Sequence, residues 1–118
     1  MEASAPRPGV PVRGSESGLP VMAALDLLGR RWTMRILWEL SQAPVGFREL
    51  QRRCERMSSS VLSTRIDELS GARLLTLDGE GYRLTELGQD LVEALSPLNA
   101  WSRRWAEETG SATAGGPE

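Results

Sequence analysis

The sequence predicts a mainly α-helical protein with a small β-hairpin: a winged helix-turn-helix with an added C-terminal dimerisation helix. Apolar residues recur at helical spacing in five segments between residues 19 and 109, which is typical of amphipathic helices. Residues 75–84 instead alternate around the turn Asp78-Gly79-Glu80-Gly81, which predicts a two-stranded hairpin. Four helices, a hairpin and a last helix is the order of a winged helix, whose third and fourth helices form the helix-turn-helix.

The first three predicted helices are short. Gly29 is a C-terminal stop for the first helix, and Ala43-Pro44 stops the second, because the residue before a proline disfavours the helical conformation. The third runs into Gln51-Arg52-Arg53-Cys54. The apolar positions behind these predictions are Val21, Met22, Leu25 and Leu28, then Trp32, Ile36, Leu37 and Leu40, then Phe47 and Leu50.

The later elements have clearer end signals. Ser58 is a good N-cap for the fourth helix, and Gly71 falls near its end. Thr85 caps the last helix, in which Pro97 should produce a kink or a division into two. The apolar positions are Val61, Leu62, Ile66 and Leu69 in the fourth helix, Leu75, Leu77, Tyr82 and Leu84 in the hairpin, and Leu87, Leu91, Leu95, Leu98, Trp101 and Trp105 in the last helix.

Length and composition indicate one domain with flexible ends. The 118 residues fit a single domain. Residues 1–18 are rich in Pro, Gly and Ser and are expected to form a disordered arm, and residues 110–118 a flexible tail. Residues 19–109 then form the folded unit for DNA binding and dimerisation. A unit this small buries a modest share of its surface, so a partner chain would stabilise it.

Composition also narrows the function. No segment has the length of a membrane span or the apolar core of a signal peptide, so we expect a cytoplasmic protein without a membrane partner. The chain has one cysteine and no histidine, which removes Ser-His-Asp and Cys-His catalysis and the commonest zinc ligand. We therefore expect no enzyme, no cofactor and no metal.

Charge is unevenly distributed along the chain. All 14 basic residues are arginine, and the formal net charge is −2. Residues 19–75 hold nine arginines against six acids, whereas residues 76–118 hold three against eight. A basic middle segment can attract an anion despite the net charge, and arginine matches phosphate geometry. A solvated basic face is the alternative interpretation.

Several motifs resemble one family of regulators when their order is taken together. They are the segment Pro20 to Gly29, Arg31-Trp32-Thr33 with Ile36-Leu37 and Glu39-Leu40, Phe47-Arg48-Glu49-Leu50, the run from Ser58 through Arg65 and Glu68-Leu69 to Leu74, and Tyr82, Leu84-Thr85-Glu86, Gly88 and Trp101. In these features the chain resembles the HxlR-type winged-helix transcriptional regulators of bacteria, relatives of the MarR group. The resemblance covers about residues 19–105 and implies a DNA-binding regulator, most often a repressor.

The chain departs from that family at three places. Leu19 stands where many members have a cysteine that senses oxidants or electrophiles, so this chemistry is not implied here. The wing is shorter than usual and carries Asp78 and Glu80. Asp67 stands where a basic or neutral polar residue is usual. The acidic residues weaken the expectation of strong DNA contact without affecting the expected fold.

The predicted recognition helix presents short polar side chains on its outward face. Such side chains allow a helix to sit deep in the major groove, although they discriminate bases poorly; a capped, solvated surface helix is the alternative. Arg65 lies at the edge of the apolar arc, where a structural salt bridge is as plausible as a phosphate contact. The candidate DNA contacts are Arg48, Arg52, Arg53, Arg56, Ser58, Ser59, Ser60, Ser63, Thr64, Arg65 and, on the wing, Arg83.

The tryptophans and the last helix suggest a dimer and a ligand slot. Trp101 and Trp105 are four residues apart and should stack on one helix face. Two such faces meeting across a two-fold axis would form a slot for a flat aromatic effector; core and dimer packing is the alternative. The candidate ligand contacts are Met22, Trp32, Trp38, Trp101 and Trp105, and the candidate dimer contacts are Leu95, Leu98 and Trp101.

Cys54 has two interpretations. Nearby arginines would favour its thiolate and make it a sensor. Leu50 lies four residues before it, which instead places Cys54 on the apolar face of the helix.

Two functions from different classes follow. The first is a homodimeric, sequence-specific transcriptional regulator, a repressor, that binds double-stranded DNA at a palindromic operator and is released by a planar aromatic small molecule. The second is a ligand-binding or protein-interaction module on a winged-helix frame with weakened DNA binding. The acidic C-terminal half and the short wing favour the second.

Overall fold

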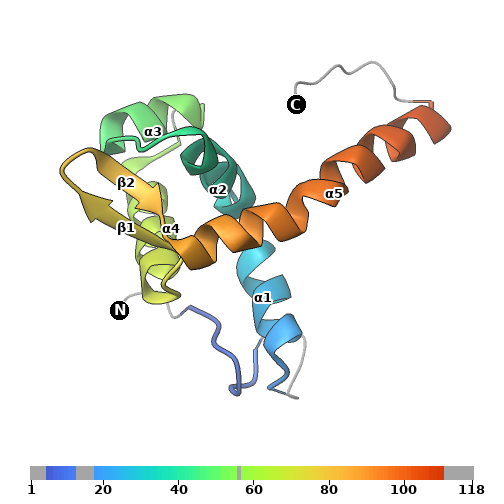
Figure 1. Ribbon diagram of the computed structural model, residues 1–118, viewed down its shortest axis with the longest axis horizontal. Helices are drawn as coiled ribbons and strands as arrows, with labels where there is room; N and C mark the ends of the chain where they lie inside the picture. The colour runs from blue at the N-terminus through green and yellow to red at the C-terminus, as the bar shows by residue number, and fades with distance from the viewer. Residues whose placement is uncertain (1–4, 13–17, 56, 111–118) are drawn as a thin grey trace.

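The computed structural model describes residues 5–12, 18–55 and 57–110 (Figure 1). Within these ranges it has five helices and one two-stranded antiparallel sheet, as the sequence predicts. The elements are α1 (Pro20–Leu28), α2 (Thr33–Gln42), α3 (Phe47–Arg53), α4 (Ser59–Gly71), β1 (Leu75–Asp78), β2 (Gly81–Leu84) and α5 (Glu86–Glu108). No helix in the described ranges is long and apolar enough to cross a membrane.

The core lies between α2, α3, α4 and the base of the hairpin. Ile36, Leu50, Leu62 and Leu69 are completely buried there. Leu91 and Val92 of α5 pack against it from one side. The second half of α5 projects away from this body (Figure 1). The helix-turn-helix therefore has a rigid support, while the last helix extends into solvent.

The hairpin is fixed to the body by backbone hydrogen bonds. Leu75 pairs with Leu84 and Asp78 with Gly81. Val45, in the loop between α2 and α3, exchanges two backbone hydrogen bonds with Tyr82, at 3.0 and 2.9 Å. Gly81 has φ 122°, and a Cβ atom there would lie 2.7 Å from the carbonyl carbon of Val45. Glycine therefore permits the close contact that positions the wing.

The predicted helix caps are confirmed. The Ser58 hydroxyl accepts a hydrogen bond from the backbone N–H of Val61 at 3.2 Å. The Thr85 hydroxyl accepts one from the N–H of Gly88 at 3.0 Å. Gly29 follows the last residue of α1, as expected. Each cap satisfies a donor that the helix itself cannot pair.

Three details differ from the sequence prediction. The buried face of α1 is formed by Ala23 and Leu27, whereas Leu25 is 57% exposed, because α1 packs at the edge of the body through one narrow face. Trp32 lies before α2 rather than inside it, with φ 75°. Of the two effects expected of Pro97, the division is absent, because α5 continues through this residue, and only a kink is compatible with the structure. Pro97 lies on the exposed side of the helix, where water can reach the carbonyl group that loses its N–H partner.

Part of the expected N-terminal arm is described. The backbone N–H of Gly9 donates to the carbonyl of Gly18 at 2.8 Å. Pro6 and Pro8 line a groove beside α1 and the start of α5. The rest of the arm, residues 1–4 and 13–17, and residues 111–118 of the expected tail lie outside the described residues.

Candidate nucleic-acid interface and effector groove

The polar face of α4 is exposed over its first two turns. Ser58 caps the helix, and Ser59, Ser60 and Ser63 are exposed. Thr64 is half-buried, and its hydroxyl donates to the carbonyl of Ser60 at 2.9 Å. These side chains are short, so the backbone of α4 can approach a groove closely. The structure brings the predicted α4 residues together on one surface.

The arginines of α3 are held by a neighbouring carboxylate. Both Arg52 and Arg53 form ion pairs with Glu49, the second at 2.8 Å. These hydrogen bonds, first from Arg52 and then from Arg53, hold the pKa of Glu49 below its usual value. The Arg52 side chain remains 70% exposed. Its guanidinium has five donors, so pairing with Glu49 leaves donors for a phosphate.

Arg53 also ties α3 to α2. Its guanidinium lies 3.9 Å from Glu39. Arg35 of α2 donates to the backbone carbonyl of Arg53 at 2.9 Å and pairs with Glu39 at 2.9 Å. Arg53 is therefore both a surface cation and part of the α2–α3 contact.

Two further predicted phosphate contacts flank this pair. Arg48 is exposed, and no ion pair involves it within the described part of the chain. Arg56 lies outside the described residues. Arg48 is thus available to an external anion without breaking an internal contact.

Arg65 takes the structural position that the sequence left open. Its Nε donates to the carbonyl of Arg31 at 2.8 Å, and its Nη1 pairs with Glu68 at 3.1 Å. Its side chain is 19% exposed. Arg65 therefore bonds toward the turn between α1 and α2, and its Nε and Nη1 both donate within the protein.

The wing carries a neutralised arginine. Arg83 lies 2.7 Å from Asp78 and 3.0 Å from Glu80. The hairpin tip thus presents two carboxylates for one guanidinium. This arrangement disfavours a close approach to phosphate unless Arg83 leaves its partners.

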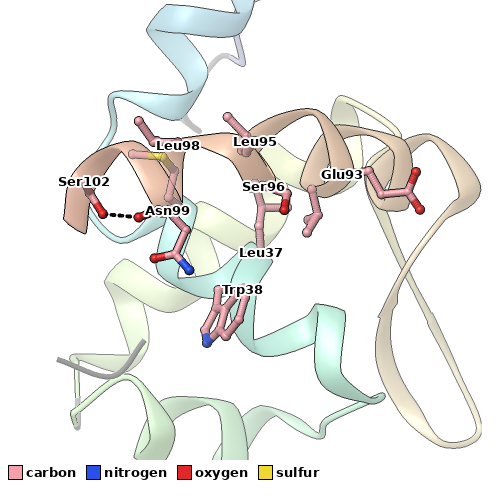
Figure 2. A pocket seen from close by; sticks show the side chains of 10 residues that line it. Leu37, Trp38, Glu93, Leu95, Ser96, Leu98, Asn99 and Ser102 are labelled. Carbon is pink, nitrogen blue, oxygen red and sulfur yellow. Dashed lines mark hydrogen bonds between the residues drawn. The ribbon is translucent and has the colours of Figure 1, made fainter. Parts of the chain in front are cut away.

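A groove lies between α2 and α5 (Figure 2). It has a volume of about 470 Å³, within the range of small-molecule sites. Trp38 forms one wall, and Figure 2 shows the Asn99 amide pointing toward it. Ser102 donates to the backbone carbonyl of Asn99 at 2.7 Å. The lining is mostly apolar: Met34, Leu37, Trp38, Val92, Leu95 and Leu98, with Glu93, Ser96, Asn99 and Ser102.

Only Trp38 of the predicted ligand residues lines this groove. Trp101 and Trp105 stack as expected, with ring centroids 5.4 Å apart and an interplanar angle of 14°, but they lie on another side of α5. Trp32 packs against the core, with Arg31 over its ring at 5.4 Å. Met22 is half-buried outside the groove. The slot expected between two copies of the Trp101–Trp105 face is a different site from this groove and stays a prediction about the dimer.

Sequence reasoning missed most of the groove. Met34 and Trp38 are four residues apart on α2, and Leu95, Asn99 and Ser102 share one face of α5. This spacing was readable, but the pairing of the two faces depends on how α5 crosses α2. The predicted pair Trp101 and Trp105 lies on a neighbouring face of α5.

Cys54 belongs to the core. It is completely buried beside the residues that hold α3 in place. Burial is the main influence on the thiol and raises its pKa above the ordinary value. A buried thiol with a raised pKa is a poor nucleophile. The apolar-face interpretation of Cys54 is confirmed.

Taken together, a capped polar helix, an arginine-bearing helix before it and a hairpin wing define a winged helix-turn-helix, the frame of DNA-binding transcriptional regulators. Comparison with known families agrees: residues 27–110 match the model described as HxlR-like helix-turn-helix. The chain belongs to this family and is a transcriptional regulator of the helix-turn-helix type.

Individual relatives are distant but cover most of the chain. An HTH-type transcriptional regulator of Methanocaldococcus jannaschii is 27% identical over 90 residues, which are 73% of this chain and 85% of the relative. The HTH-type transcriptional regulator YodB of Bacillus subtilis is 28% identical over 92 residues, 72% of this chain and 82% of its own length.

Solved structures show the same fold. The quinone-bound crystal structure of YodB superposes with a TM-score of 0.66 and 28% identity, covering 71% of this chain and 94% of that one. A MarR-family regulator from Enterococcus faecalis superposes with a TM-score of 0.69 at 24% identity, covering 84% and 96%.

Proposed function

We propose that the protein is a homodimeric repressor that binds a palindromic operator in the cytoplasm, and that it acts by binding rather than by catalysis. The observation that carries this proposal is the surface of α4: a capped helix with exposed serines, next to the arginines of α3. In this proposal Ser60, Ser63 and Thr64 would contact base edges, and Ser58 and Ser59, at the start of the helix, would contact phosphates.

Phosphate contacts would come mainly from α3. Arg48, Arg52 and Arg53 are all exposed, and the Arg52 side chain, at 70%, is more exposed than that of Arg53, at 40%. Arg56, which lies outside the described residues, stays a candidate phosphate contact on the basis of the sequence. Arg65 and Arg83 contribute less, because their guanidinium groups are held by carboxylates of this chain.

Dimerisation would cover an apolar stripe. Leu98, Trp101 and Trp105 are each about half exposed on the projecting part of α5. Val21 and Leu25 form a second exposed apolar pair on α1. A small monomer rarely leaves so much apolar surface uncovered. Leu95 is half-buried in the groove and would support the stripe rather than form it.

The test is selection of bound sites from a random pool of DNA, followed by salt titration and sedimentation. We expect a palindromic consensus, affinity that falls steeply with salt, and a dimer at micromolar concentration. Weak, sequence-independent binding would instead support the alternative, a ligand-binding or protein-interaction module, which the acidic wing favours. A stable monomer of the unmodified protein at micromolar concentration would contradict the dimer. The Leu98→Asp variant, by contrast, should be monomeric.

A second proposal concerns an effector. The α2–α5 groove suits a planar aromatic molecule that stacks on Trp38 and accepts or donates a hydrogen bond at Asn99. The structure of the related YodB is described as quinone-bound, which makes a flat ring with polar oxygens the first class to test.

Tryptophan fluorescence can show whether the ligand binds in the α2–α5 groove or on the Trp101–Trp105 face. Planar aromatic compounds should quench tryptophan emission and weaken operator binding. Trp38→Ala should remove both effects, whereas Trp105→Ala should retain them if the groove is the site. The reverse pattern would assign the ligand to the Trp101–Trp105 face. No response to a broad panel of compounds would exclude the effector proposal.

A further inference from the structure

Four charged side chains form a cluster beside the recognition helix and outside the α2–α5 groove. They come from three parts of the chain: Asp26 on α1, Arg30 in the turn after it, and Arg65 and Glu68 on α4. All four side chains are less than one-fifth exposed, and Glu68 is 2% exposed. Two carboxylates and two guanidinium groups give the cluster no net charge.

The two oxygens of Glu68 accept from different elements. Oε2 accepts from Arg30 at 2.8 Å, and Oε1 accepts from Arg65 at 3.1 Å. Arg30 uses its other terminal nitrogen to contact Asp26 at 3.2 Å. The recognition helix is thereby connected to α1 by a chain of charge-assisted hydrogen bonds, which are shorter and more directional than neutral ones.

The same contacts hold a strained turn. Trp32 has φ 75°, a conformation that bulky residues rarely adopt. On one side its ring is covered by Arg31, and the carbonyl of Arg31 accepts from Nε of Arg65 at 2.8 Å. Arg65 of α4 therefore bonds directly to the backbone of the turn between α1 and α2, beside the strained residue.

We propose that this cluster of Asp26, Arg30, Arg65 and Glu68 sets the position of the recognition helix relative to α1, and that Glu68 and Arg30 are positioning residues for operator choice. The effect of the cluster on operator choice rests on the proposed function as a DNA-binding dimer. α1 presents Val21 and Leu25 to the proposed dimer partner, so the α1–α4 geometry determines the separation of the two recognition helices. Buried charged groups often contribute little to stability but can select one arrangement among several.

The first test measures geometry without DNA. Spin labels at Val21→Cys and Ser63→Cys, in a Cys54→Ala background and diluted with unlabelled protein, report the α1–α4 distance. Arg30→Lys keeps the charge but offers one nitrogen instead of the two that contact Asp26 and Glu68. Glu68→Gln keeps the length but not the charge. The matched control is Glu108→Gln, which breaks an exposed pair with Arg104 on α5.

We expect one narrow distance in the unmodified background and in the control, and a distribution at least about twice as broad in Arg30→Lys. Circular dichroism shows that each variant is folded. The same narrow distance in folded Arg30→Lys and Glu68→Gln overturns the proposal. If Glu68→Gln unfolds, the milder Arg30→Lys decides alone.

The second test measures operator choice. One base pair inserted between half-sites separates them by about 3.4 Å. The unmodified protein should discriminate against the altered operator, and Arg30→Lys should lose about tenfold of that discrimination while binding random DNA equally well. If Arg30→Lys lost affinity equally for the operator and for random DNA, the variant would have a general binding defect, and the positioning role would be contradicted. If the unmodified protein has no preferred site, the repressor proposal fails, while the distance measurement still decides the role of the cluster.

Discussion

Arg52→Ala tests the proposed DNA contact most directly. Arg52 is 70% exposed, and its ion pair with Glu49 lies on the surface of α3. Surface pairs contribute little to stability, so the variant should fold and dimerise normally. Its effect should appear in DNA binding alone.

The expected magnitude follows from counting phosphates. Each phosphate contact contributes about −0.9 to the slope of log affinity against log salt. A dimer would present Arg52 twice, so the slope should become less negative by about 1.8. Between about 50 and 200 mM salt, the affinity of the variant should therefore fall about 12-fold less than that of the unmodified protein.

Fluorescence anisotropy with labelled operator and with random duplex, at four or more salt concentrations, measures this slope. Both DNAs should show the same change, because a phosphate contact carries no sequence information. Arg104→Ala is the matched control: it also removes an exposed arginine paired with one glutamate, but on the projecting part of α5. An unchanged slope in Arg52→Ala, or an equal change in Arg104→Ala, would refute the assignment of α3 to the phosphate backbone.

Three further predictions concern stability, reactivity and the wing. Gly88→Ala should lower the free energy of unfolding by about 1–3 kcal/mol in urea denaturation, because a Cβ atom would lie 2.1 Å from a backbone carbonyl oxygen, whereas Gly71→Ala, with open space around it, should not destabilise. Cys54 should react with iodoacetamide only as fast as the protein unfolds, since burial raises its pKa; rapid labelling of folded protein would contradict this. Asp78→Asn combined with Glu80→Gln should strengthen binding to operator and random DNA alike by releasing the wing arginine, and unchanged affinity would place the wing away from DNA.

Local sequence signals predicted the elements well because their causes are local. A serine or threonine at a helix start satisfies a free N–H within three residues, so Ser58 and Thr85 could be identified without tertiary information. The alternation around Gly79 and Gly81 likewise specified the hairpin. The spacing of apolar residues within each segment was enough to predict the order of helices and strands.

The faces of the helices were harder to predict because burial depends on which elements meet. α1 has apolar residues on two sides, and only the side with Ala23 and Leu27 packs against the body. The charged residues gave the same difficulty. The angular position of Arg65 at the edge of the apolar arc left a salt bridge and a phosphate contact equally plausible, whereas the structure shows that Arg65 bonds to Glu68 and to the distant carbonyl of Arg31 and that Arg52 remains 70% exposed. The acceptors that hold Arg65, the Arg31 carbonyl and the Glu68 carboxylate, decide between its two interpretations, and the distant Arg31 carbonyl could not be located from spacing within α4.

Arginine is the only basic residue type in this weakly acidic chain. Its geometry explains how the same side chain can hold elements of the protein together and also serve as a proposed phosphate contact. A guanidinium group has five donors in a fixed plane and can contact two acceptors in different directions, which an ammonium group does less well. Arg30 uses this property inside the protein, with one nitrogen on Asp26 and another on Glu68. Arg52 has the same capacity at the surface, since its contact with Glu49 fixes the side chain and leaves other donors facing solvent. At Arg52 the neighbouring carboxylate therefore orients the guanidinium group and leaves it accessible, unlike the two carboxylates beside Arg83 on the wing. The net charge of −2 is for this reason compatible with the proposed phosphate contact on α3.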